Sequence, residues 1–211
     1  PEFKLEKKIV DRRIDLLIEE GIKFICSTNV GIDISVKNLI QEYDAICLAG
    51  GSTVPRDLSI GGRDLDGIHF AMDFLSEQNR WDTKKSNVRN ISAKNKNVVI
   101  IGGGDTGADC LGTTIRQGAK NIVQLEILPE PPIIRSSSNP WPEWPLILRT
   151  TSAHEESGER EFSVLTKSFD GITNVKNLTC QKVKWGKDPD SQKFEMKILN
   201  KSEFKIKADL V

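Results

Sequence analysis

Three glycines near the middle of the chain carry the clearest chemical signal. Gly102, Gly104 and Gly107 follow an apolar run at 98–101 and open a helix-like segment. In this pattern the first glycine permits a tight turn, the second lets a phosphate approach the backbone, and the third lets the helix pack close to the strand. The free N–H groups at the helix start then favour a pyrophosphate. The residues of the predicted dinucleotide site are Gly102, Gly103, Gly104, Asp105, Thr106 and Gly107.

The elements around the loop agree with this reading. We expect a strand at 98–101, a helix at about 105–117 that ends at Gly118, and a second strand at 121–129. A strand–glycine–helix–strand order is the context that the glycine spacing requires, because the spacing alone is a weak signal. The alternative is a glycine-rich turn that is kept for structure and binds nothing.

Two charged residues downstream bear on which dinucleotide binds. Glu126 lies 24 residues after Gly102, close to the ~20-residue offset of the acid that binds ribose hydroxyls. A carboxylate there repels a 2′-phosphate, so Glu126 favours NADH over NADPH, unless it points to solvent. Arg135, nine residues later, is the alternative partner for a phosphate.

Two aspartates at the helix start have other interpretations. Asp105 is predicted to cap the helix through its carboxylate, since an acid is an unusual neighbour for a pyrophosphate. Asp109 is interpreted either as a positioning residue or as a solvated helix charge.

The first fifty residues predict an αβαβ order. Apolar residues at helical spacing mark a helix at 5–20, followed by a strand at 22–30. A short helix at 34–43, with Ser35 as its N-cap, precedes a buried strand at 44–52 that runs into glycines. Such an order is typical of parallel strands with crossover helices.

The rest of the chain changes character twice. A helix at 70–79 and a polar linker at 80–96 lead to the glycine unit, and a Pro-Trp segment (129–150) follows it. We expect the Pro-Trp segment to be irregular and to pack over a surface, because it is rich in proline yet apolar. Alternation of apolar and polar residues then predicts three strands, with a hairpin connection between the last two. These are the strands at 162–169, 175–186 and 193–200, and the connection at 186–192.

Composition limits the class of protein. Thirty basic and thirty acidic residues cancel, which argues against a nucleic-acid or membrane-surface protein. No apolar run approaches the ~18–20 residues of a membrane span. The cysteines lie singly, outside any C-x-x-C, so we expect four small core residues and no metal ligand. We expect a cytoplasmic location, with a plastid as the alternative, and a fragment of a longer protein, since the chain lacks an initial Met.

Longer stretches resemble a known family. The residues AGGSTVPRDLSIGG, GGGDTGADCLGTTIRQGAK, NPWPEWPLILRT and EFSVLTK are similar to the small subunit, or C-terminal reductase region, of NAD(P)H-dependent glutamate synthase. More broadly, the chain resembles the adrenodoxin-reductase-like flavoproteins with two dinucleotide sites. The resemblance covers essentially the whole chain, and NPWPEWP and EFSVLTK are more specific than the glycine loop.

The resemblance implies a division of labour. In that family an interrupted FAD domain holds an inserted NAD(P)H domain, and electrons pass through iron–sulfur clusters to a large-subunit region that makes glutamate from glutamine and 2-oxoglutarate. By resemblance, 1–67 are part of the FAD domain, 68–200 form the NAD(P)H domain, and 201–211 return to the FAD domain. The fold class is α/β: a Rossmann-like dinucleotide-binding domain with an appended β meander, plus part of the FAD domain.

The resemblance also sets expectations for flavin. Gly50 and Gly51 match a strand-end motif that runs past the flavin, although Gly50 stands where threonine is usual. The family's first glycine loop and its cysteine clusters would precede Pro1. We therefore expect FAD to bind this chain weakly or not at all, iron–sulfur clusters to lie outside it, and the isolated chain to be inactive. No catalytic side chain is named, since hydride transfer between stacked rings needs none.

Three other classes of protein are weighed against this one. A hydrolase triad would have to use His69 or His154, and neither lies near a G-x-S-x-G elbow. A non-catalytic binding module would show no dinucleotide affinity. Another flavoprotein reductase, pyrimidine-reducing or ferredoxin-linked, is disfavoured by the tryptophan–proline stretch.

Overall fold

The structure is a computed structural model that describes residues 1–52, 54–188 and 193–211. The described chain divides into two compact units, Glu2–Arg56 and Asp57–Val211, with Pro1 assigned to the latter. The larger unit contains the predicted glycine loop. No helix in the described part of the chain is both long and apolar enough to cross a bilayer.

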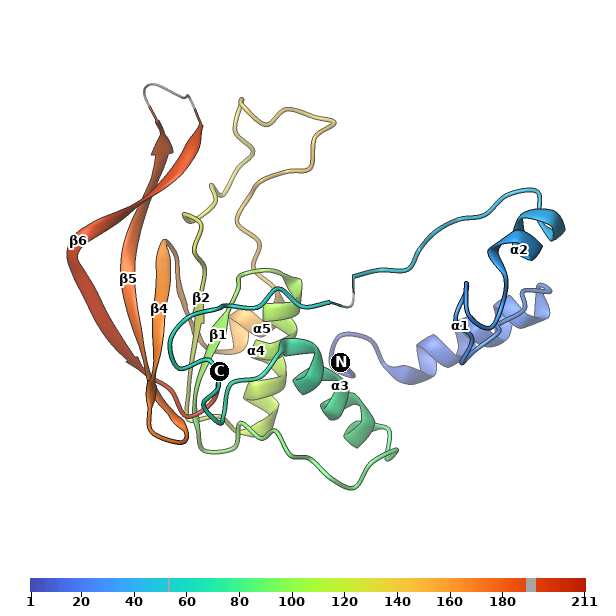
Figure 1. Ribbon diagram of the computed structural model, residues 1–211, viewed down its shortest axis with the longest axis horizontal. Coiled ribbons are helices and arrows are strands. Elements are labelled where there is room, and N and C mark those ends of the chain that lie inside the picture. Colours follow the sequence, from blue (N-terminus) through green and yellow to red (C-terminus); the bar gives the residue numbers. More distant parts are fainter. Residues whose placement is uncertain (53, 189–192) are drawn as a thin grey trace. The chain divides into compact units, whose positions relative to one another are not determined.

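The larger unit is built around a parallel sheet (Figure 1). Its strands are β1 (Asn97–Ile101), β2 (Asn121–Leu125) and β3 (Glu159–Glu161), in that spatial order. The C-terminal residues lie on the other side of β1, where Leu210 forms a parallel bridge with Val98. The glycine loop thus follows a strand that has neighbours on both sides.

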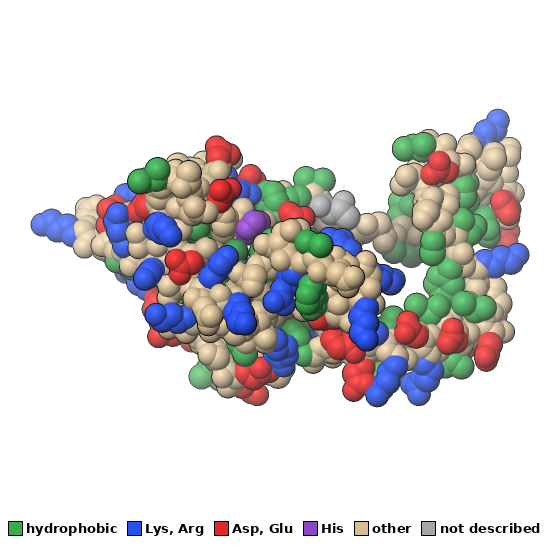
Figure 2. Space-filling model, turned by 90° about the horizontal axis from the view of Figure 1, so that it is seen from below, with side chains coloured by type: hydrophobic (Ala, Val, Ile, Leu, Met, Phe, Trp, Pro, Cys, Tyr) green, Lys and Arg blue, Asp and Glu red, His purple; other side chains and the backbone are tan. Residues whose placement is uncertain are grey.

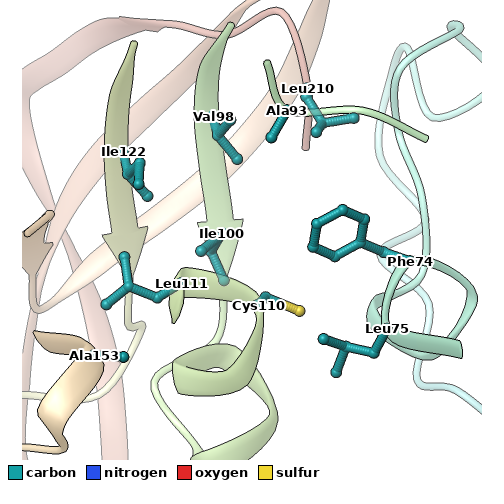
Figure 3. Close-up of a cluster of buried hydrophobic side chains, with 10 residues drawn as sticks. All are labelled: Phe74, Leu75, Ala93, Val98, Ile100, Cys110, Leu111, Ile122, Ala153 and Leu210. Atoms are coloured by element: carbon teal, nitrogen blue, oxygen red, sulfur yellow. The ribbon is translucent and has the colours of Figure 1, made fainter. Parts of the chain in front are cut away.

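Helices cover one face of this sheet. They are α3 (Ala71–Asp82), α4 (Asp105–Gln117) and the short α5 (Ser152–Glu156). Figure 3 shows Val98 and Ile100 of β1 facing Cys110 and Leu111 of α4. The alternation of strand side chains sends Val99 to the opposite face, where it is fully buried.

An antiparallel meander covers that opposite face (Figure 1). It consists of β4 (Val164–Gly171), β5 (Val175–Lys187) and β6 (Phe194–Lys207). The three predicted strands are therefore confirmed, although β6 continues seven residues beyond the predicted end. The predicted hairpin connection falls partly on 189–192, outside the described residues, but Lys187 and Phe194 on either side of it pair.

Two helices predicted for the larger unit are confirmed. Those at 70–79 and 105–117 correspond to α3 and α4, and Gly118 closes α4 in the left-handed conformation (φ 78°). The α/β fold class, with a Rossmann-like sheet and an appended meander, is confirmed. The stretch 201–211, predicted to return to the FAD domain, here forms the end of β6 and the bridge to β1.

The smaller unit differs from its prediction. It contains α1 (Lys7–Glu19) and α2 (Val36–Glu42), but the strands predicted at 22–30 and 44–52 do not form among its described residues. Ile25 is 65% exposed and Leu48 is 93% exposed. A parallel strand needs a hydrogen-bonded neighbour and two covered faces, and the described unit offers neither.

The cysteine prediction is correct for only half of the residues. Cys110 and Cys180 are buried, and burial raises the pKa of these thiols to about 12 and about 11. Cys26 and Cys47 lie in the strands that do not form and are exposed, so their assignment to a core was wrong. Among the described residues no group of three or more His, Cys, Asp or Glu side chains is arranged to hold a metal ion.

Surface charge is mixed. On the face in Figure 2 the basic and acidic side chains are interspersed rather than gathered by sign, in keeping with the net charge of zero.

Leu111 gives a direct test of the helix-covered core. It is 1% exposed and belongs to the cluster between α4 and the sheet. We expect Leu111→Ala to lower the free energy of unfolding by about 2–5 kcal/mol, because it leaves a cavity. Urea denaturation of the chain measures this. The matched control is Ile172→Ala, at a side chain 97% exposed, which should change stability by less than about 0.5 kcal/mol.

The carboxylate of Asp209 ties the C-terminal segment to β1. It accepts hydrogen bonds from the backbone N–H of Asn97 at 3.0 Å and from the Asn97 side-chain amide at 2.6 Å. The backbone bond is the main cause that lowers the pKa of Asp209 below its ordinary value of 3.8. A lowered folded-state pKa contributes stability above pH 3.8 and loses it as the pH falls through the folded value.

Asp209→Asn should therefore be less stable than the wild type at neutral pH, and the difference should shrink below about pH 4. Urea denaturation at several pH values measures it, with exposed Asp64→Asn as the control. A difference that is independent of pH would contradict the assignment.

Candidate functional site

The glycine loop begins where β1 ends. Gly102 has φ 121°, a conformation that other residues rarely adopt, and its N–H donates to the Leu125 carbonyl at 2.8 Å. A Cβ atom built on Gly102 or on Gly104 would meet nothing within 4 Å. The backbone at these two positions therefore faces open space, which is the surface that a phosphate needs to approach.

Gly107 has the opposite environment. A Cβ atom there would lie 2.4 Å from the Gly102 carbonyl oxygen and 2.6 Å from Nε2 of Gln124. This contact lets the first turn of α4 pack directly on the end of β1. The three glycines thus divide the roles that their spacing predicts: two leave the backbone open and one permits close packing.

The start of α4 carries no side-chain cap. Gly104 is the N-cap residue, so the prediction that the Asp105 carboxylate caps the helix is wrong. The reason is register: Asp105 is the first helical residue, one position too late for an N-cap. Asp105 and Thr106 are exposed, and Asp109 lies one turn further on. The N–H groups of the first helical turn have no acceptor within the helix.

Glu126 lies at the loop, as the sequence predicted. It directly follows β2, and its Oε2 accepts a hydrogen bond from the Gly103 N–H at 2.8 Å. Its other oxygen accepts from the Leu128 N–H at 3.0 Å. These bonds hold a half-buried carboxylate beside the glycine backbone. Carboxylate oxygens have further lone pairs, which can accept from ribose hydroxyls.

Arg135 is placed within the Pro-Trp segment instead. Its Nη1 donates to the Asn139 carbonyl at 3.4 Å. Asn139 is buried and organises the segment, because its side chain bonds the Trp144 carbonyl and the Leu146 N–H. No described contact brings Arg135 to the glycine loop.

The Pro-Trp segment leaves its apolar side chains exposed. Ile133, Ile134 and Trp141 are 81%, 78% and 83% exposed, and the segment extends away from the sheet in Figure 1. The segment therefore does not pack over a surface of the described chain, and its role as a contact with another subunit stays a prediction. Its hydrogen bonds are largely internal, such as Leu148 N–H to the Pro132 carbonyl at 2.8 Å, so its shape does not require a surface beneath it.

Two residues at the loop were missed by the sequence analysis. Gln124 is buried in β2, and its Nε2 donates to the Gly102 carbonyl at 2.8 Å. Its Oε1 lies 2.8 Å from Nε2 of His154 in α5. A polar residue within the apolar stretch 122–125 was the available signal for Gln124. As a functional residue, His154 was considered only for a hydrolase triad, which was disfavoured.

The remaining predicted site residues belong to the other unit. Gly50 and Gly51 lie in irregular chain of the unit Glu2–Arg56, and a Cβ atom on either would meet nothing within 4 Å. The described contacts give them no partner that would mark a flavin site.

A strand, an open glycine loop, a helix N-terminus and an acidic residue after the second strand define a dinucleotide-binding α/β protein. The model of the pyridine nucleotide-disulphide oxidoreductase family matches residues 6–211. The chain belongs to this family.

Curated relatives are similar over the whole chain. Glutamate synthase [NADH] of Schizosaccharomyces pombe is 46% identical over 223 residues, covering 100% of this chain and 10% of that protein. Glutamate synthase [NADPH] small chain of Mycobacterium tuberculosis is 48% identical, covering 100% of this chain and 43% of that protein. The chain thus spans less than half the length of these relatives. The resemblance to the glutamate synthase reductase region is confirmed.

Solved structures agree on the fold. A mutant of FprA from Mycobacterium tuberculosis superposes with a TM-score of 0.62 at 15% identity, covering 100% of this chain and 58% of that one. FprA in complex with NADPH gives 0.54 at 15% identity, covering 87% of this chain and 52% of that one. At this identity the likeness concerns the fold alone.

The two kinds of glycine predict opposite mutant behaviour. Gly107→Ala should destabilise the chain by about 1–3 kcal/mol, because its methyl group would overlap the Gly102 carbonyl. Gly104→Ala, at φ −79° with open space around it, should change stability by less than about 1 kcal/mol yet weaken the binding of a dinucleotide. Urea denaturation and calorimetric titration with NADH separate the two effects. Equal stability of both variants would contradict this division of roles.

Proposed function

We propose that this chain binds the pyrophosphate of a reduced nicotinamide dinucleotide at its glycine loop. The observation that carries the proposal is the contrast among the glycines: Gly102 and Gly104 leave the backbone open, while Gly107 is packed against it. An open backbone at a helix N-terminus provides N–H donors and a positive dipole end for phosphate oxygens. Gly103, Asp105 and Thr106 complete the proposed site.

The preferred dinucleotide is NADH. Glu126 is held beside Gly103, where an adenosine ribose would adjoin the loop. Its carboxylate accepts from the two hydroxyls of NADH but repels the 2′-phosphate of NADPH. Arg135, the alternative phosphate partner, donates to its own segment. The names of the relatives divide between NADH and NADPH at 46% and 48% identity, so the preference rests on Glu126.

In the whole protein we assign the chain to the reductase part of a glutamate synthase. The names of the full-length relatives support this assignment. A nicotinamide held at the glycine loop would supply a hydride to FAD, and glutamate formation from glutamine and 2-oxoglutarate would consume the two electrons. FAD and the glutamate synthase large-subunit region are thus the proposed partners. We expect the chain alone to hold FAD weakly or not at all, and the open surroundings of Gly50 and Gly51, where a Cβ atom would meet nothing within 4 Å, are consistent with this.

Calorimetric titration of the chain with NADH and with NADPH tests the function and the preference together. We expect NADH to bind at least about tenfold more tightly, a difference of about 1.4 kcal/mol. Glu126→Gln retains an oxygen acceptor for the Gly103 N–H but removes the charge, so it should bring the two affinities within about threefold.

The control is Glu130→Gln, at an exposed carboxylate of the Pro-Trp segment, which should leave both affinities unchanged. Equal or tighter binding of NADPH by the wild type would overturn the role of Glu126. Binding of neither dinucleotide would overturn the proposed site in this chain.

A further inference from the structure

The buried amide of Gln124 bridges the glycine loop and α5. Gln124 is 2% exposed, in the middle of β2. One end of its side chain donates to the Gly102 carbonyl at 2.8 Å, and the other end lies 2.8 Å from Nε2 of His154. A buried amide is costly unless its polar atoms are paired, and here both ends have partners.

The hydrogen bonds of this bridge run in one direction. The backbone N–H of Thr151 points at Nδ1 of His154 at 3.1 Å. A backbone N–H can only donate, so Nδ1 accepts and the ring proton is assigned to Nε2. His154 then donates to Oε1 of Gln124, which turns the NH₂ group of Gln124 toward the Gly102 carbonyl. Rotating that amide by 180° would place its NH₂ group against the Nε2–H donor of His154 and its oxygen against the Gly102 carbonyl oxygen.

The helix that carries His154, α5, is anchored through two residues close to His154 in the sequence. Its neighbour Ala153 is fully buried in the core cluster of the helix-covered face. Glu156 forms a two-pronged ion pair with Arg116 of α4, with N–O distances of 3.0 and 3.1 Å. The imidazole is therefore fixed relative to the helix that follows the glycine loop.

The peptide that joins Gly102 and Gly103 is held at both of its polar groups. Gln124 holds the carbonyl oxygen, and Glu126 accepts from the N–H at 2.8 Å. Gln124 lies in β2 and Glu126 directly follows β2, so the two residues that clamp the peptide are two positions apart in the sequence. Glycine can rotate such a peptide easily, because it lacks a Cβ. A flipped peptide would turn the Gly102 carbonyl away from Gln124 and change the donors that the loop presents.

We propose that Gln124 and His154 are positioning residues that fix this peptide for dinucleotide binding. The inference rests on the proposed function, because it assigns the loop to a pyrophosphate. Neither residue touches the dinucleotide. They act through the Gly102 carbonyl, whose orientation decides which backbone groups face the phosphates.

Four chains test the proposal: wild type, His154→Leu, His154→Gln and Gln124→Met. A glutamine side chain can place its NH₂ group where Nε2 of histidine lies, so His154→Gln keeps the donor to Gln124, and His154→Leu removes it. Gln124→Met keeps the unbranched shape but removes both hydrogen-bonding groups. Calorimetric titration with NADH and ¹H–¹⁵N NMR of the Gly103 amide are measured for each, with urea denaturation to verify folding.

We expect His154→Leu and Gln124→Met to weaken NADH binding by about tenfold and to shift the Gly103 resonance, since each removes a hydrogen bond from the clamp. His154→Gln should stay within about threefold of the wild type. A merely structural role would not be rescued by His154→Gln in this way. If Gln124→Met does not fold, the two His154 variants decide the matter.

If His154→Leu binds NADH as tightly as the wild type and its Gly103 resonance is unshifted, the positioning role is overturned, whereas the proposed function is not affected. Failure of the wild type to bind NADH would overturn the proposed function. The Gly103 resonance would then still test the clamp in the unliganded chain. A shift in His154→Leu but not in His154→Gln would support the clamp, and no shift in either would overturn it.

Discussion

The close approach of α4 to the end of β1 is the constraint on which the site depends. It exists because Gly107 has no side chain at the point where a Cβ atom would lie 2.4 Å from the Gly102 carbonyl. The contact lets the helix start directly above the strand end, so its N-terminal N–H groups meet the open backbone of the loop. Leu111 and Cys110, further along the same helix, then pack on Val98 and Ile100.

The sheet beneath the loop is completed by chain segments that are distant in sequence. Leu210 pairs beside Val98, and Asp209 binds both amides of Asn97. On the meander side, the N–H of Phe169 donates to the Gly61 carbonyl, which ties the stretch before α3 to β4. These contacts make the larger unit one structure with a core on each face of the sheet, and the loop is held by strands rather than by other loops.

The sequence predicted what is local and missed what is not. Gly102 and Gly118, on either side of α4, were predictable because their positive φ angles favour glycine. Gly107 was predictable because a side chain there would collide with the end of β1. The strand at 44–52 was predicted from an apolar run alone, but a strand forms only where a neighbour accepts its hydrogen bonds. The same limit explains the error for Cys47, whose burial depended on that strand.

The candidate site shows the same difference between local features, which the sequence predicts, and long-range contacts, which it does not. Glu126 was found because a fixed number of residues separates the loop from the end of the second strand. Its bond to Gly103 was not predictable, because a spacing in the sequence does not specify which backbone group a carboxylate contacts. The contact between Gln124 and His154 was not predictable either, because these residues are 30 positions apart and meet only when α5 packs on α4.

The proposed site divides its tasks between the backbone and one side chain. In the proposal the pyrophosphate is bound by backbone groups, whose placement depends on the glycines and on the clamp around Gly102, and NADH and NADPH both carry this pyrophosphate. In the same proposal, discrimination between NADH and NADPH rests on the charge of Glu126 at the end of β2, which touches the loop through one hydrogen bond. A change from Glu126 to glutamine would remove this charge and keep an oxygen acceptor for the Gly103 N–H, so the strand, the loop and the helix would stay as they are. Under this proposal the cofactor preference would depend on one side chain, while pyrophosphate binding would depend on the backbone.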